Sequence, residues 1–174
     1  MLPVQFRTVG RVFESERADM AVTVADDAPA GVRRRPLFRG WFVAVSDVRH
    51  TKLGKKPSLE RYLEHEHVVV SYNGDLRGIV EDFLGIERRA RCSVATFASL
   101  GEILEGSALV ATVPSMVGRT LTARYRHLRA VPVPFGVAGA SIELLWSAAS
   151  DDDPACSFVR DRIVELTADV PSGP

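Results

Sequence analysis

The sequence has little that would mark a secreted, membrane-bound or disulfide-stabilised protein. Only two cysteines, Cys92 and Cys156, occur among its 174 residues, which favours reduced thiols in a cytoplasmic protein over a disulfide scaffold. No apolar run approaches the roughly 20 residues that cross a bilayer. The first residues, MLPVQFRTVG, lack a basic segment followed by an apolar core, so no signal peptide is predicted. We therefore expect a cytoplasmic globular protein without membrane contact.

An excess of one charge is also missing. Lys plus Arg and Asp plus Glu both number 22, so the formal net charge is zero. A surface that binds polyanions in general is not indicated, although a local basic patch is compatible with this balance. We expect Arg33–Arg35 and the lysines 52, 55 and 56 to be charged, solvated loop residues, with a contact to DNA or to a partner as the alternative.

Motifs for catalysis, for phosphate binding and for metal binding are absent or weak. The patterns G-x-S-x-G, G-x-G-x-x-G and the P-loop do not occur, and Ser71 has no obvious base beside it. His65 and His67 have the spacing of two metal ligands on a strand, but Glu64 and Glu66 alternate with them and no third ligand stands out. We expect no catalytic residue, no metal and no cofactor.

What the sequence does have is a series of three strand-to-helix transitions between residues 68 and 114. The apolar runs VVVS, SVAT and ALVATV each lead directly into a helix start. Strands that feed helices in series form a parallel sheet, and the helix N-termini then gather at one edge, where a small ligand can bind. This pattern predicts an α/β binding module.

The first of these helices has clear local signals. Asp75 is the expected N-cap, and Leu76, Ile79 and Val80 share one helix face. Gly85 is expected to end the helix in a left-handed conformation.

The next two helices follow in the same way. Ser99 and Glu102 form a predicted capping box for the second, which ends at Gly106, and the third is expected to begin at Pro114-Ser115. In the rest of the chain, Asp153 and Pro154 mark the start of the last helix. The other expected elements are strands at 3–9, 20–25, 37–46, 128–135 and 140–147 and helices at 11–18 and 58–66. The two prolines of 128–135 favour an edge or crossover position for that strand.

An ordered set of segments resembles the effector-binding domain of LysR-type transcriptional regulators. The segments are RADMAVTV, RRRPLFRGWFVAVSDVRH, SLERYLEHEHVVVSYNGD, SVATFASLGEILEGSALVATVPSMVGRTL and IELLWSAASDDDPACSFVRDRI. The resemblance covers roughly residues 3–166 and is greatest to the branch of nodulation and aromatic-degradation regulators. It implies a type 2 periplasmic-binding-protein fold, in which two Rossmann-like α/β lobes have a ligand cleft between them.

The resemblance also implies a domain organisation. Lobe I would combine residues 1–66 with 137–170, lobe II would be 67–136, and 171–174 would be a disordered tail. The first strand and helix of lobe I, and the winged helix-turn-helix domain of these regulators, are expected to be absent from this chain. The implied partners are a small-molecule effector, a second copy of the chain in a dimer or tetramer, and DNA only through that missing domain.

The expected ligand contacts lie at strand ends. Several of the residues at these strand ends also have a purely structural explanation. Gly74 is foremost a turn residue, the Ser71 hydroxyl could bond neighbouring backbone in place of a ligand, and Phe97, Val113 and Pro114 could belong to the core. Apolar walls with a few polar groups suit a small, partly apolar acid such as an aromatic carboxylate. The resemblance implies ligand contacts by Ser71, Gly74, Thr96, Phe97, Val113 and Pro114 from lobe II, and by Val24 and Ala25 from lobe I.

The function expected from these observations is effector sensing in a transcriptional regulator. The alternatives are a solute-binding protein of a transport system and, less favoured, an enzyme on the same two-lobed fold. A helix-turn-helix coding segment, a signal sequence or a neighbouring metabolic gene upstream of Met1 would distinguish the three.

Overall fold

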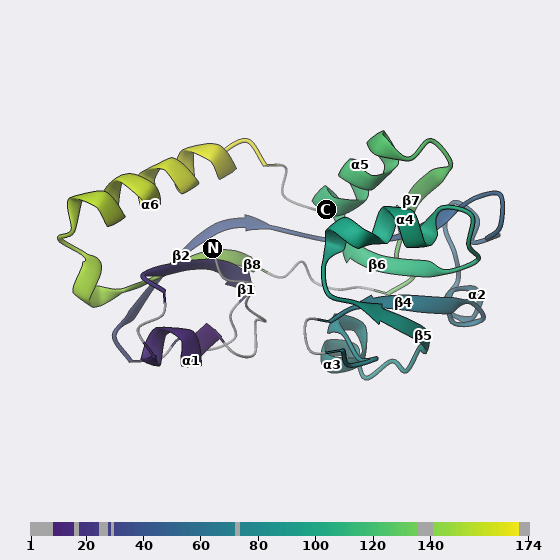
Figure 1. The fold of residues 1–174 in the computed structure, drawn as a ribbon, viewed down its shortest axis with the longest axis horizontal. Coiled ribbons are helices and arrows are strands. Elements are labelled where there is room, and N and C mark those ends of the chain that lie inside the picture. The colour runs from purple at the N-terminus through teal and green to yellow at the C-terminus, as the bar shows by residue number, and fades with distance from the viewer. Residues whose placement is uncertain are drawn as a thin grey trace. The chain divides into compact units, whose positions relative to one another are not determined.

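The chain folds into two compact units. The computed structural model describes residues 9–15, 18–24, 28, 30–71, 74–135 and 141–170. Unit 1 comprises 1–40 with 139–174, and unit 2 comprises 41–138 (Figure 1). The expected division at 66/67 therefore lies at 40/41 instead, because strand β3 (Phe42–Asp47) pairs with β6 (Val110–Pro114) and β7 (Leu128–Pro132) of unit 2.

Unit 1 contains an antiparallel sheet with the order β1-β8-β2. Its strands are β1 (Met20–Val24), β2 (Val32–Arg39) and β8 (Ser141–Ser147), with β8 paired to both others. Helices α1 (Val9–Glu14) and α6 (Pro154–Thr167) lie on opposite sides of this sheet (Figure 1), and the short helix η3 (Ala148–Ser150) precedes α6. Val9 and Phe13 of α1 pack with Leu145 of β8 as the core of the unit.

The arginine run of unit 1 lies in a strand and not in a loop, which corrects the sequence-based expectation. Arg33, Arg34 and Arg35 belong to β2, at the edge of the sheet, and all three are exposed. Ion pairs explain why arginine is accepted there: Arg34 bonds Glu143 of the neighbouring strand β8 at 2.7 Å, and Arg33 bonds Asp151, at the end of η3, at 3.2 Å. Charged side chains on an edge strand also discourage pairing with other chains.

Helix α6 begins as the sequence predicts. The Asp153 carboxylate accepts a hydrogen bond from the Cys156 N–H at 2.8 Å, and Pro154 is the first helical residue. Its apolar residues are less buried than a core-facing helix requires, since Phe158 is 72% exposed and Leu166 65% exposed.

Unit 2 contains a mixed sheet with the order β5-β4-β6-β3-β7. β4 (Glu66–Val70) runs parallel to β5 (Arg89–Val94) and to β6, whereas β3 is antiparallel to β6 and β7. The predicted parallel arrangement of the three central strands is confirmed, as is the edge position of the proline-bearing β7.

The two faces of this sheet have different covers. Helices α4 (Leu100–Leu104) and α5 (Ser115–Arg124) pack on one face and enclose an apolar core. Helix α2 (Leu59–Leu63) packs on the other, where Tyr62 contacts Ala44 and Val110. The N-cap of α2 is Ser58, as expected, and its hydroxyl accepts from the Arg61 N–H at 3.1 Å.

The helix after β4 starts later than predicted. α3 spans Ile79–Leu84 with Gly78 as its N-cap, so the expectation that Asp75 caps the helix is wrong. The physical reason is that Gly78 has an extended backbone and gives its N–H to the Glu81 carboxylate at 2.8 Å, which starts the helix there. Gly85 ends α3 in the left-handed conformation, as predicted.

The predicted capping box at Ser99 and Glu102 is also wrong. A 3-10 turn, η2 (Phe97–Ser99), precedes α4, so Ser99 already has helical backbone angles and its side chain makes no cap hydrogen bond. The extended N-cap of this earlier turn is Thr96.

Two further predictions fall mostly or wholly on residues outside the described ranges. The predicted strand at 3–9 falls outside the described residues except for Val9, which is helical, and the tail 171–174 lies wholly outside them. None of the helices formed by the described residues is both long and apolar enough to cross a bilayer.

Candidate ligand-binding edge of unit 2

The carboxyl ends of three adjacent strands form a row in unit 2. Val70 of β4 is in register with Val94 of β5, and the Ser71 N–H donates to the Val94 carbonyl at 2.9 Å. On the other side β4 is in register with β6, from His67 opposite Val110 onward. Below, the carboxyl edge of unit 2 means the residues at and just after the ends of these strands, which are 71 with 74–78, 95–99 and 114–116.

The loop after β4 is held by backbone geometry. Gly74 has a φ of 83°, a left-handed conformation that favours glycine, and its N–H donates to the Ser71 carbonyl at 3.4 Å. Its own carbonyl accepts from the Ser93 hydroxyl at 3.1 Å. Ser71 is buried, while Gly74 is exposed. Both therefore lie at the carboxyl edge, and their contact with a ligand stays a prediction.

The residues after β5 present one exposed and one half-buried side chain. Thr96 is exposed, and its hydroxyl lies 3.3 Å from that of Ser99. Phe97 is half-buried and packs against the apolar core under α4 and α5. Thr96 is thus the more accessible of the two predicted contacts.

The residues around the end of β6 differ in the same way. Val113 is fully buried in the core, so its side chain does not reach the surface, whereas Pro114 is half-buried. The Ser115 N–H donates to the Trp41 carbonyl at 2.8 Å, which ties the start of α5 to the chain before β3. Pro114 supplies no side-chain cap to α5, a helix of 10 residues whose N-terminal N–H groups favour an anion.

Sequence reasoning missed several side chains at this edge. Leu76 is 50% exposed and Met116 is 41% exposed, and in the segment after β5 Ala95 and Ala98 are exposed as well. Their place directly after the strands is visible in the sequence, but the apolar spacing puts Leu76 on a helix face with Ile79 and Val80, whereas α3 begins only at Ile79.

Of the two contacts predicted from the other lobe, only Val24 is among the described residues. Val24 is the last residue of β1 in unit 1 and is half-buried. Ala25 lies outside the described residues. The structure therefore brings five of the six predicted residues of unit 2 to one sheet edge, whereas the side chain of the sixth, Val113, is buried in the core.

A buried polar cluster lies on the opposite face of the sheet from α4 and α5. It consists of Tyr62, His67, Glu81, Arg88 and Thr112. The Arg88 guanidinium bonds both carboxylate oxygens of Glu81, at 2.6 and 2.7 Å, and donates to the Tyr62 hydroxyl at 3.3 Å. The Tyr62 and Thr112 hydroxyls are hydrogen-bonded at 2.5 Å.

Burial and the Arg88 charge govern the pKa values in this cluster. Burial raises the pKa of Glu81, but the hydrogen bonds and charge of Arg88 outweigh it, so this pKa lies below its ordinary value. Burial, assisted by the Arg88 charge, lowers the pKa of His67 to about 4. His67 is therefore neutral at pH 7, with its Nε2 3.0 Å from the Tyr62 carbonyl.

His65 and His67 have the sequence spacing of two possible metal ligands, and the described part of the chain offers no further ligands to complete such a site. There, no group of three or more His, Cys, Asp or Glu side chains is placed to hold a metal ion.

Comparison with known proteins identifies the family. The model of the LysR substrate binding domain matches residues 4–168. The chain belongs to this family. Its sequence is 32% identical over 157 residues to the HTH-type transcriptional activator NagR of Ralstonia sp., covering 88% of this chain and 52% of NagR. Nodulation proteins D of rhizobia also match, in agreement with the expected branch of the family.

Solved structures of the LysR family share the fold. The regulatory domain of MexT, a transcriptional activator in Pseudomonas aeruginosa, aligns with a TM-score of 0.77 and 29% identity, over 90% of this chain and 76% of that one. The effector-binding domain of QuiR, solved in complex with shikimate, aligns with a TM-score of 0.67 and 15% identity, over 96% and 80% of the two chains. The fold is therefore that of the LysR effector-binding domains, a type 2 periplasmic-binding-protein fold, as the resemblance implied.

Membership of this family favours an effector-binding domain of a transcriptional regulator over a solute-binding protein of a transport system. The chain spans about half the length of the curated relatives that it matches.

Proposed function

We propose that this LysR substrate-binding domain senses a small carboxylate with an apolar or aromatic body, and that the carboxyl edge of unit 2 contacts it. The proposal includes ligand contacts by Ser71, Gly74, Thr96 and Pro114, with Leu76 and Met116 added. The exposure of these two large apolar side chains, Leu76 in the loop after β4 and Met116 in the first turn of α5, is the observation that carries the proposal.

The chemistry of the edge supports this ligand class. Leu76 and Met116 offer apolar surface to a ring or an alkyl body, and the N–H groups of the first turn of α5 after Ser115, which has no side-chain cap, favour a carboxylate. QuiR, a more distant domain with the same fold, was solved with shikimate. We therefore assign the ligand an anionic group near α5 and an apolar group near Leu76 and Met116.

Calorimetry with matched probes tests the ligand class. Benzoate combines the charge with the ring, benzamide keeps the ring without the charge, and cyclohexanecarboxylate keeps the charge without aromaticity. The proposal expects benzoate to bind, benzamide to bind at least about tenfold more weakly, and cyclohexanecarboxylate to fall between them. Equal affinity for benzoate and benzamide would contradict the role of the α5 N-terminus, and no binding by any carboxylate would reject the proposal.

Substitution at Thr96 tests the place of the ligand. Thr96→Trp adds a large ring at the carboxyl edge on an exposed side chain, so it is expected to block benzoate binding and leave the fold intact. Thr120→Trp is the matched control, because Thr120 is an exposed threonine further along α5. Undiminished affinity in Thr96→Trp would reject this placement.

Self-association is proposed for the same chain, since LysR-type regulators oligomerise. The exposed apolar residues of α6, Phe158 and Leu166, are the surface that a second copy would bury. Phe158→Glu is expected to shift sedimentation toward the monomer, whereas Val48→Glu, at a residue 50% exposed in unit 2, is not. A wild-type chain that sediments as a monomer at high concentration would reject the interface.

The rest of the regulator's activity is proposed from its relatives. NagR is a transcriptional activator about twice as long as the matched region, so control of transcription would need DNA contacts from a helix-turn-helix domain joined to this one. Ligand binding would act by favouring one arrangement of that longer protein through differential affinity. We also propose a cytoplasmic location and assign no catalytic step to the chain.

A further inference from the structure

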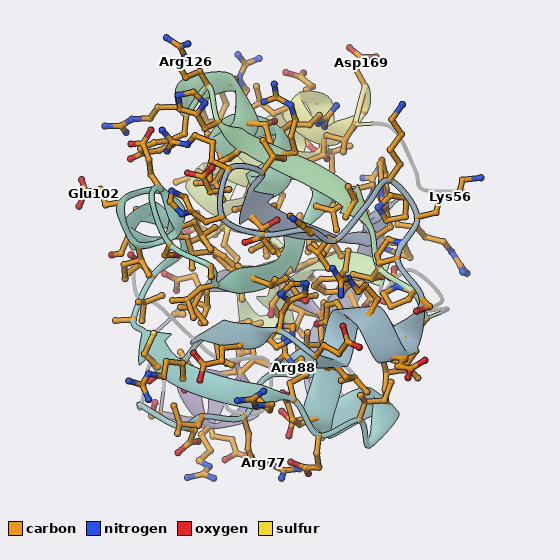
Figure 2. The ribbon with its side chains drawn as sticks, turned by 90° about the vertical axis from the view of Figure 1, so that its right-hand side faces the viewer. Lys56, Arg77, Arg88, Glu102, Arg126 and Asp169 are labelled. Atoms are coloured by element: carbon orange, nitrogen blue, oxygen red, sulfur yellow. The ribbon has the colours of Figure 1, made fainter. Side chains whose placement is uncertain are left out.

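Glu81 and Arg88 form an ion pair with an uncommon degree of burial. Their side chains are 2% and 3% exposed, and the guanidinium contacts both carboxylate oxygens. Each of the other ion pairs found among the described residues has at least one partner that is 42% exposed or more. Figure 2 agrees with this contrast, since Arg88 lies within the body of the molecule, whereas Arg77, Arg126 and Lys56 extend from its outline.

This ion pair also holds the end of a segment at the carboxyl edge. The carboxylate oxygen of Glu81 that bonds the Arg88 Nη2 at 2.7 Å also accepts the Gly78 N–H at 2.8 Å. Gly78 is the last residue of the segment 74–78, which carries Gly74 and the exposed Leu76. A Cβ at Gly78 would lie 2.9 Å from Cγ1 of Val69 in β4, so the segment returns to the sheet at a distance that leaves no room for a side chain.

The other side of the ion pair is fixed to the sheet. Arg88 reaches the Tyr62 hydroxyl, which is bonded to Thr112 of β6. The Tyr62 ring in turn packs against the His67 ring with centroids 4.5 Å apart. A continuous chain of contacts thus runs from two strands of the sheet to the Gly78 N–H.

We infer that Glu81 and Arg88 are positioning residues that hold the segment 74–78 at the carboxyl edge and thereby set the affinity for the effector without touching it. The effect on affinity rests on the function proposed above, whereas the effect on the segment does not. A two-point guanidinium–carboxylate pair fixes the orientation of the carboxylate, and this orientation aims one oxygen at Gly78.

A stability role and a positioning role predict different results. Replacing both members of a buried ion pair with apolar residues of similar volume is often neutral or stabilising for the fold, because neither charge is then left unpaired. Apolar side chains cannot accept the Gly78 N–H, so the segment would lose its attachment even in a folded protein.

The test is the double variant Glu81→Met/Arg88→Met, studied by hydrogen exchange and by urea unfolding. The inference expects the urea midpoint to stay close to that of the wild type, while the amides of residues 75–78 exchange at least about tenfold faster. The control is Arg61→Met/Glu64→Met, which removes an exposed ion pair from α2, with side chains 44% and 51% exposed. Its amides 75–78 should exchange as in the wild type.

A second variant covers the case in which the double variant does not fold. Arg88→Lys leaves Glu81 with a cation but removes the two-point contact, so a smaller acceleration confined to 75–78 is expected. Unchanged exchange of residues 75–78 in the folded variants would overturn the inference, as would an acceleration spread evenly over the whole of unit 2.

Benzoate titration separates the inference from the proposed function. If the wild type binds benzoate, the double variant is expected to bind at least about fivefold more weakly and the Arg61/Glu64 control equally well. Equal affinity in the double variant would overturn the link between the ion pair and the ligand. A wild type that binds no carboxylate would reject the proposed function, and the exchange result would then decide the positioning role alone.

Discussion

The two faces of the unit 2 sheet are built from alternating residues of the same strands, yet they differ in chemistry. In β6, Ala111 and Val113 face the apolar core under α4 and α5, whereas Thr112 faces the buried polar cluster. In β4, Val68 belongs to the apolar core and His67 to the polar cluster. The face under α4 and α5 is mainly apolar, with Asp47 accepting the Gly106 N–H at the end of α4, while the other face combines the apolar contacts of Tyr62 with a set of matched donors and acceptors.

This difference has an energetic meaning. Apolar packing is non-directional and tolerates small shifts, whereas a buried polar group costs free energy as soon as its partner is removed. The polar face is therefore suited to fixing one position of a loop, and the apolar face to providing stability. The predictions below test that division of roles.

The largest effect is expected on the apolar face. Leu104→Ala removes a fully buried side chain of α4 and leaves a cavity, which should lower the free energy of unfolding by about 3 to 4 kcal/mol. Urea denaturation measures this change. A loss below about 1 kcal/mol would mean that the face collapses easily and is not close-packed.

The second effect is a pH dependence on the polar face. The pKa of His67 lies near 4 in the folded protein and near 6.5 in the unfolded chain, so the unfolded chain binds the extra proton between these values. Stability is then unaffected above about pH 6.5 and should fall by up to about 3 kcal/mol as the pH drops toward 4.

A matched variant isolates this contribution. His67→Gln keeps a neutral polar side chain and removes the titration, whereas carboxylates such as Glu81 titrate in both proteins. The difference in unfolding free energy between wild type and variant should therefore change across the window from 6.5 to 4. A constant difference would show that His67 does not carry the pH dependence.

The smallest effect is expected from a single hydroxyl. Tyr62→Phe removes the oxygen that bonds Thr112 and Arg88, at a cost of about 1 to 2 kcal/mol in unfolding free energy. The aromatic contacts with His67 and Phe135 remain. A loss as large as that of Leu104→Ala would contradict the division between the two faces.

The elements that were predicted well are those with local causes. The central parallel strands follow from apolar runs, and the start of α6 follows from Asp153 and Pro154, whose effects lie within one turn. The starts of α3 and α4 were missed although their contacts are also short-range, because Asp75 and Ser99 are residue types that commonly cap helices and neither caps one here. In α3 the deciding contact is the bond between Gly78 and Glu81, together with the close approach of Gly78 to Val69.

The candidate site was predictable in place but not in detail. Strand ends located Ser71, Gly74, Thr96 and Pro114, since parallel strands bring their carboxyl ends to one edge. The positioning role of Arg88 had no local signal, because it stands in the run ERRAR, where nothing marks one arginine for burial. Its burial depends on partners from other segments.

The most direct test of the central claim is a titration of the isotope-labelled chain with benzoate, followed by the shifts of its backbone amide resonances. We predict that the largest shifts in unit 2 fall on residues 71 and 74–78, 95–99 and 115–116, with saturation at a common affinity. Saturable shifts in unit 2 that cluster away from these three segments, or no saturable shifts at all, would contradict the assignment of the carboxyl edge as the ligand-binding site.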